Sequence, residues 1–228
     1  MKLERLKDRI WVYPYEEERD RPNLTYIRGD RWSLAVDAGH SAEHTREFYQ
    51  ALEAEGLPLP QLTVITHWHW DHTLGMHAVH GLTLANEITN RHLAALDKQL
   101  REEGTEVLLS WHETIRREYA NGQRVVVTLA DMTFTGEMHL DAGNCPIHIF
   151  QADSPHTDDS TLVYVPNDKL LILGDSTGGR FPDWYFDQVS GDNLAETIQK
   201  VNPELCLPGH WTVLPTKGVV QELLDGEG

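Results

Sequence analysis

The heptapeptide THWHWDH, residues 66–72, places three histidines and an aspartate within six positions. A structural histidine usually occurs singly, because neighbouring imidazoles repel each other when charged and pack poorly when neutral. A metal ion removes this conflict, since it takes neutral imidazole nitrogens and carboxylate oxygens as ligands. The stretch therefore predicts a metal site.

The spacing within this stretch predicts two metal ions. Residues 62–66 are apolar and β-branched, as expected of a buried strand that delivers the chain to His67. In an extended segment residues two apart point the same way, so His67 and His69 can share one metal ion. Asp71 and His72 are expected in the bend before a helix that starts at residue 73. From there they would reach a second metal ion a few ångströms away.

Two metal ions need more ligands than this stretch supplies, and three later residues each follow closely on a predicted strand. They are His156 in SPHTDD, Asp175 in LILGDS and His210 in LPGHW. Strand ends are where convergent ligands on a rigid scaffold are expected. We therefore expect these three side chains to complete the site.

The rest of the chain alternates between strand-like and helix-like patterns. Strands are predicted at 10–13, 24–28, 32–36, 62–66, 124–128, 132–135, 147–151, 162–165, 170–173 and 205–207, and helices at 41–55, 87–120 (a pair broken at Gly104), 193–201 and 217–224. This order predicts an α+β fold, a four-layer αββα sandwich in which two mixed β-sheets pack face to face with helices outside. We expect a single domain over residues 1–228, with 87–120 as a helical insertion that is either an ordinary helical layer or a lid.

Composition narrows the range of partners. Hydrophobic residues make up 40% of the 228, charged residues 24%, and the formal net charge is -17. Such a charge repels phosphate backbones and anionic lipids, so nucleic acid and membrane partners are not expected, and a small-molecule substrate is. The absence of an apolar leader and of a CxxC pattern around Cys145 and Cys206 predicts a cytoplasmic location. The sequence leaves the oligomeric state open.

HWHWDH has the HxHxDH form of the metallo-β-lactamase-fold superfamily. SPHTDDS, LGDS and PGHW resemble, in the same order, the third histidine, the bridging aspartate and the last histidine of that family. The likeness runs from the VDAG turn near Asp37 to His210 and implies the metallo-β-lactamase fold. It implies a first metal ion on His67, His69 and His156, a second on Asp71, His72 and His210, and Asp175 bridging the two. Asp37 would orient a ligand histidine through its carboxylate. The chain departs from the family in PHTDD, where many members have GHTPG.

The resemblance also implies an activity. We expect a dinuclear metal-dependent hydrolase in which a metal-bridging hydroxide, positioned by Asp71 and Asp175, attacks a small ester, lactone, thioester, amide or phosphoester. Two zinc ions are expected, with iron or manganese as alternatives. Two other interpretations stay open: an iron-dependent dioxygenase of the same fold, and a metal-binding scaffold without catalysis.

Aromatic residues flank the proposed ligands. Trp68, Trp184 and Tyr185 are candidates for substrate contact, and so is His40 beside the VDAG turn. Trp211, next to His210, is a further candidate wall of an apolar pocket. The other histidines are expected to be ordinary surface or core residues; they are His44, His77, His80, His92, His112, His139 and His148.

Overall fold

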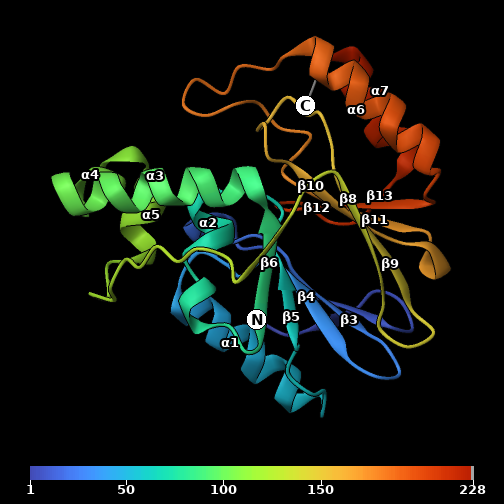
Figure 1. Cartoon of the computed structure of the whole chain (residues 1–228), viewed down its shortest axis with the longest axis horizontal. Helices are drawn as coiled ribbons and strands as arrows, with labels where there is room; N and C mark the ends of the chain where they lie inside the picture. Colours follow the sequence, from blue (N-terminus) through green and yellow to red (C-terminus); the bar gives the residue numbers. More distant parts are fainter. Residues whose placement is uncertain (227–228) are drawn as a thin grey trace.

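The first β-sheet of the computed structural model, which describes residues 1–226, has seven strands in the order β1-β2-β3-β4-β5-β6-β7 (Figure 1). The strands are β1 (Glu4–Arg5), β2 (Ile10–Tyr13), β3 (Leu24–Arg28), β4 (Ser33–Val36), β5 (Leu62–Val64), β6 (Leu82–Asn86) and β7 (Met132–Phe134). Strands β1 to β4 pair antiparallel, and β4 to β7 pair parallel. The parallel part requires crossovers, and helices supply them.

The second sheet has six strands in the order β13-β12-β11-β10-β9-β8. The strands are β8 (Glu137–Asp141), β9 (Pro146–Gln151), β10 (Thr161–Val165), β11 (Leu170–Gly174), β12 (Leu205–Pro208) and β13 (Leu214–Pro215). All neighbours pair antiparallel except β11 and β12. Both sheets are therefore mixed, as predicted.

The inner faces of the two sheets meet in one apolar core. Val36 and Val64 of the first sheet belong to the same buried cluster as Ile149 and Val163 of the second. Burying apolar surface stabilises a fold by about 25 cal/mol per Å² removed from water. This shared core fixes the two sheets against each other, and with them the strand ends that carry the candidate ligands.

Helices cover the outer faces (Figure 1). They are α1 (Ala42–Ala54), α2 (Trp70–Thr73), α3 (Glu87–Glu103), α4 (Glu106–Trp111), α5 (Glu113–Glu118), α6 (Gln188–Val201) and α7 (Thr216–Asp225), with short 3-10 turns η1 (Glu17–Arg19), η2 (Met76–Ala78) and η3 (Pro166–Asp168). Phe48 of α1 packs with Tyr26 on the first sheet, and Ile198 of α6 packs with Leu171 on the second. The predicted four-layer αββα sandwich is confirmed. No helix within residues 1–226 has both the length and the apolarity that a membrane span requires.

Two predictions of secondary structure were wrong or incomplete. The predicted strand at residues 124–128 has no regular structure. Val125 and Val127 instead pack beside Leu108 and Ile115 of the helical insertion, so their alternation reflects burial without a neighbouring strand. Strand β6 was missed because Asn86 ends it and also caps α3, where its side chain accepts a hydrogen bond from the amide of Ile88.

The helical insertion contains three helices, α3 to α5, where a pair was predicted. Its last turn is tied to the N-terminal segment: Glu118 forms two 2.8 Å contacts with the guanidinium of Arg21, and both side chains are fully buried. The hydroxyl of Tyr119 donates to the carbonyl of His40 at 2.9 Å. These contacts support the interpretation of residues 87–120 as a packed helical layer.

Candidate metal centre

The first four candidate ligands follow β5 on the first sheet. His67 and His69 lie on the extended segment after β5, and α2 begins at Trp70. Asp71 and His72 therefore lie inside this short helix, which corrects the prediction of a bend before a helix start at residue 73. The ring of His72 still lies close to the first histidines, with its centroid 4.2 Å from that of His67.

The other three candidate ligands come from the second sheet. His156 lies in the loop after β9, where the hydroxyls of Ser154 and Ser160 lie 2.7 Å apart and the amide of His156 donates to Ser154 at 3.3 Å. Asp175 directly follows β11, and His210 follows β12. The facing sheets therefore bring residues from distant parts of the chain to one edge of the sandwich.

Three imidazoles form the first cluster. The Nε2 atom of His156 lies 3.3 Å from Nε2 of His67 and 2.9 Å from Nδ1 of His69. On its other side the His156 ring donates from Nδ1 to the carbonyl of Gly179 at 2.7 Å, which leaves the lone pair of Nε2 free to face the cluster. All three rings are buried.

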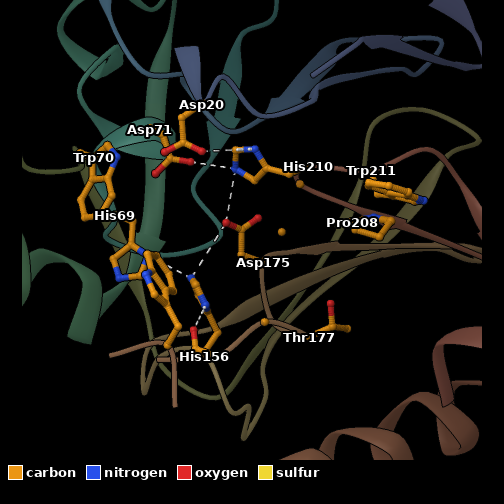
Figure 2. Close-up of a pocket in the computed structure, with 15 residues that line it drawn as sticks. Asp20, His69, Trp70, Asp71, His156, Asp175, Thr177, Pro208, His210 and Trp211 are labelled. Atoms are coloured by element: carbon orange, nitrogen blue, oxygen red, sulfur yellow. Dashed lines mark hydrogen bonds and ion pairs between the residues drawn. The ribbon is translucent and has the colours of Figure 1, made fainter. Parts of the chain in front are cut away.

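Asp71, His72, Asp175 and His210 form the second cluster. The Nε2 atom of His210 lies 2.9 Å from Oδ2 of Asp71 and 3.4 Å from Oδ2 of Asp175. The same Asp175 oxygen lies 3.2 Å from Nε2 of His72 and 3.9 Å from Nε2 of His156. Asp175 therefore lies between the two clusters, as Figure 2 shows.

Asp37 occupies the position behind His72 that the resemblance implied. The Nδ1 atom of His72 lies 2.8 Å from Oδ2 of Asp37, and the backbone amide of Thr66 donates to Oδ1 at 2.8 Å. When the ring of His72 is neutral, Nδ1 carries the proton in this contact and Nε2 points its lone pair toward the second cluster.

The two clusters differ in electrostatics. Burial, together with the neighbouring imidazoles, lowers the pKa of His67 well below its usual range and that of His69 to about 3. These rings are neutral at neutral pH, the form that binds a metal ion. Burial opposes the charge on His72 as well, but Asp71 and Asp175 raise its pKa well above the usual range. The pKa of His210 is raised in the same way.

The donor set fits metal binding. Among residues 1–226, Nε2 of His72 and Oδ1 of Asp175 are buried without a hydrogen-bond partner. Nε2 of His72 lies 3.0 Å from Oδ2 of Asp71, but the contact lacks the geometry of a hydrogen bond. Carboxylate oxygens packed against an imidazole lone pair call for a cation between them, and imidazole with carboxylate suits zinc, iron or manganese.

A sequence model of the metallo-beta-lactamase superfamily matches residues 18–210. The chain belongs to the metallo-beta-lactamase superfamily. No curated protein matches the chain in sequence at a significant level.

Solved structures of the superfamily share the fold. A metallo-beta-lactamase from Pontibacter korlensis aligns over 99% of this chain and 98% of its own, with a TM-score of 0.70 and 16% identity. The DIM-1 metallo-beta-lactamase aligns over 99% and 96%, with a TM-score of 0.68 and 19% identity. TMB-1 aligns over 99% and 96%, with a TM-score of 0.68 and 18% identity. At these identities the likeness establishes the fold.

In this metallo-beta-lactamase superfamily member a cavity of about 340 Å³ opens over the two clusters. Trp70, Trp184 and Trp211 line it together with His69, Asp71, His156, Asp175 and His210 (Figure 2). Among the described residues that line it, none is a lysine or an arginine. Arg180, Trp68 and Phe181 line an adjoining recess of about 250 Å³, and His69 and His156 border both spaces.

The four predicted substrate contacts have different outcomes. Trp184 lines the cavity and is half exposed. Trp68 lines the neighbouring recess, and Tyr185 is exposed but lines neither. His40 is 0% exposed, and its Nδ1 lies 2.9 Å from the carbonyl of Arg19, so the prediction of substrate contact is wrong for this residue.

Asp20 was not among the predicted site residues, but it lines the cavity with an oxygen 3.8 Å from Nδ1 of His210. Its backbone is left-handed, with φ of 53°, and its carbonyl lies 3.1 Å from Nδ1 of His40. The hydroxyl of Thr114 donates to its other oxygen at 3.2 Å. Asp20 stands in the run EEERD, which resembles a solvated charged segment, and only the fold turns it inward.

Proposed function

We propose that the chain is a dinuclear zinc hydrolase that acts on an uncharged or cationic small molecule with an apolar part. His67, His69 and His156 would hold the first ion, and Asp71, His72 and His210 the second, with Asp175 shared between them. The observation that carries this proposal is the convergence of all seven side chains, with Asp175 within 3.9 Å of histidines from both clusters.

When bound, two such ions would lower the pKa of a coordinated water molecule far below its bulk value, toward neutrality, and would supply a nucleophile at neutral pH. The protein's own contribution is to fix the donors before substrate arrives. Asp37 holds the ring of His72, and Gly179 holds that of His156. Asp71 and Asp175 would orient the attacking water toward the substrate.

The cavity supports the choice of substrate class. Its volume of about 340 Å³ suits a small molecule, and three tryptophans provide apolar walls. A phosphoester or carboxylate would find no lysine or arginine among the described lining residues, and would meet Asp20 instead. We therefore favour neutral esters, lactones, thioesters and amides over phosphoesters.

Metal content is the first test. Elemental mass analysis of protein prepared without added metal should give about two zinc ions per chain. About one iron per chain would instead support the dioxygenase alternative, and oxygen uptake would be the next assay.

Turnover is the second test. A panel of nitrophenyl esters, lactones and thioesters should identify a substrate whose hydrolysis stops in His69→Ala and in Asp175→Ala, while circular dichroism shows a retained fold. His77→Ala, at an exposed position outside both clusters and the cavity lining, is the matched control and should keep activity. Full activity in a double replacement of His69 and Asp175 would overturn the proposal.

A further inference from the structure

A third group of metal-binding side chains lies on the outer edge of the second sheet, away from the residues that line the cavity. Glu137 and His139 belong to β8, and His148 belongs to β9. One ligand atom from each lies within 4.8 Å of the others. The sequence predicted ordinary roles for both histidines, because nothing in their spacing reveals that they face each other.

Strand pairing places them together. β8 and β9 pair antiparallel over five residues, with His139 directly opposite His148 and Glu137 opposite Phe150. Because side chains alternate along a strand, these four side chains lie on one face of the sheet. Met138 and Leu140 lie on the other face and pack against the core. Side chains on paired strands are held more firmly than side chains on loops, which favours a defined site.

The two imidazoles lie close to each other and to the carboxylate of Glu137, and a rotation of the exposed His139 ring out of the stack would let both Nε2 atoms face one ion. Their rings stack with centroids 4.1 Å apart and planes 12° apart, and the ring of Phe150 lies 4.7 Å from that of His148. Nε2 of His148 lies 2.8 Å from Oε2 of Glu137, and Nε2 of His139 lies 3.9 Å from the same oxygen. Within the part of the chain that the structure describes, Glu137 forms no ion pair with lysine or arginine.

We infer that Glu137, His139 and His148 form a binding site for one zinc-type divalent metal ion, separate from the central pair. Two imidazoles and a carboxylate are a donor set that zinc uses in proteins, with water completing the coordination. The net charge of -17 favours accumulation of cations near the surface. Because the side chains of Glu137 and His139 are 63% and 68% exposed, this site should bind more weakly than the buried centre and exchange its ion readily.

The test is a calorimetric titration of zinc-loaded protein with further Zn²⁺. Wild type should take up one additional equivalent per chain. His139→Gln and His148→Gln should lose this equivalent, and Glu137→Gln should weaken it. His77→Gln, which removes an exposed histidine outside the cluster, should leave it intact. The imidazole NMR signals of His139 and His148 should shift together during the same titration.

Several outcomes would overturn the inference. Wild type could take up no equivalent beyond the central pair, or both histidine variants could retain it. Equal binding of Mg²⁺ would show attraction to the carboxylate alone, because Mg²⁺ prefers oxygen ligands. Thermal unfolding in chelator should be the same for all variants, which shows that the exposed substitutions leave the fold intact. The additional equivalent of Zn²⁺ should also bind to His69→Ala, which lacks a ligand of the central pair. A failure of the surface-site proposal can therefore be distinguished from a failure of the hydrolase proposal.

Discussion

Asp37 contacts the ring of His72 with one carboxylate oxygen and the backbone of Thr66 with the other. Oδ2 lies 2.8 Å from Nδ1 of His72, and Oδ1 accepts a hydrogen bond from the amide of Thr66 at 2.8 Å. Both oxygens face N–H donors, and the residue adopts a left-handed backbone with φ of 65°. Asparagine tolerates this conformation but offers only one oxygen.

Asp37→Asn should therefore keep the fold and weaken metal binding about 10–100-fold, measured by competition with a chelator. Asp131→Asn is the matched control, since Oδ2 of Asp131 accepts the amide and the hydroxyl of Thr83 away from the centre. An unchanged affinity in Asp37→Asn would contradict the orienting role.

Gly209 makes room for Asp175. A Cβ atom at this position would lie 2.1 Å from Oδ1 of Asp175 and 3.1 Å from Cε1 of His72. Gly209→Ala should displace the carboxylate and lower metal content, measured by elemental analysis after gel filtration. Gly218→Ala in α7 is the control, because a Cβ there meets nothing within 4 Å. Full metal content in Gly209→Ala would show that the carboxylate can move aside without loss.

The ion pair between Arg21 and Glu118 is fully buried, and breaking it should be costly. Glu118→Gln would remove the carboxylate that meets the guanidinium at 2.8 Å and leave Glu47 at 3.1 Å, so the free energy of unfolding measured in urea should fall by up to about 3–5 kcal/mol. Glu102→Gln, which breaks an exposed pair with Lys98, should have a far smaller effect. A small change in Glu118→Gln would mean that the carboxylate of Glu47, 3.1 Å from the guanidinium of Arg21, compensates.

His44 should make stability depend on pH. Burial, helped by the charge of Arg21, lowers its pKa well below the usual range, and its Nδ1 accepts the amide of His40 at 3.3 Å. In the unfolded chain His44 takes up a proton near pH 6.5, whereas in the folded protein the buried ring stays neutral. The free energy of unfolding therefore falls as the pH drops below this value. The free energy of unfolding can be measured in urea at several pH values between 5 and 6.5. Its slope against pH should be smaller in His44→Gln than in wild type by up to about 1.4 kcal/mol per pH unit. An identical slope would show that the native ring is protonated.

Asp20 should set the charge preference of the cavity. Asp20→Asn should raise kcat/KM for an anionic nitrophenyl ester relative to a neutral one by roughly tenfold, as expected for removing a charge several ångströms away. Asp183→Asn is the control, since it removes a carboxylate beside Trp184 that does not line the cavity. An equal fall in both rates would mean that Asp20 acts only through His210.

The candidate ligands were predictable because each carries its own local signal. One such signal is a pair of histidines two residues apart after an apolar strand. Another is a polar residue at the end of a strand, as after β11 and β12. The structure brings these residues together. Asp20 and the pair His139 and His148 carry no such signal. Asp20 turns inward because its neighbour Arg21 is held by Glu118, 97 residues further along the chain. The pair of His139 and His148 depends on the register of β8 and β9.

The strands that were missed have a related explanation. β8 is exposed along one face, so its charged residues obscure the alternation of Met138 and Leu140. The residues around Val125 are the opposite case, because they alternate like a strand but form none. On its outer side β6 pairs with β7, not with these residues. Burial pattern alone cannot separate a strand from a loop that packs against helices.

The two halves of the metal centre come from opposite sheets: His67, His69, Asp71 and His72 follow β5, while His156, Asp175 and His210 follow β9, β11 and β12. A metal ion shared between them would fasten the N-terminal half of the chain to the C-terminal half at the rim of the sandwich. Its ligands cannot assemble until both sheets have formed and docked. Bound metal would then stabilise the docked sheets, and a chelator should lower the free energy of unfolding of the folded chain.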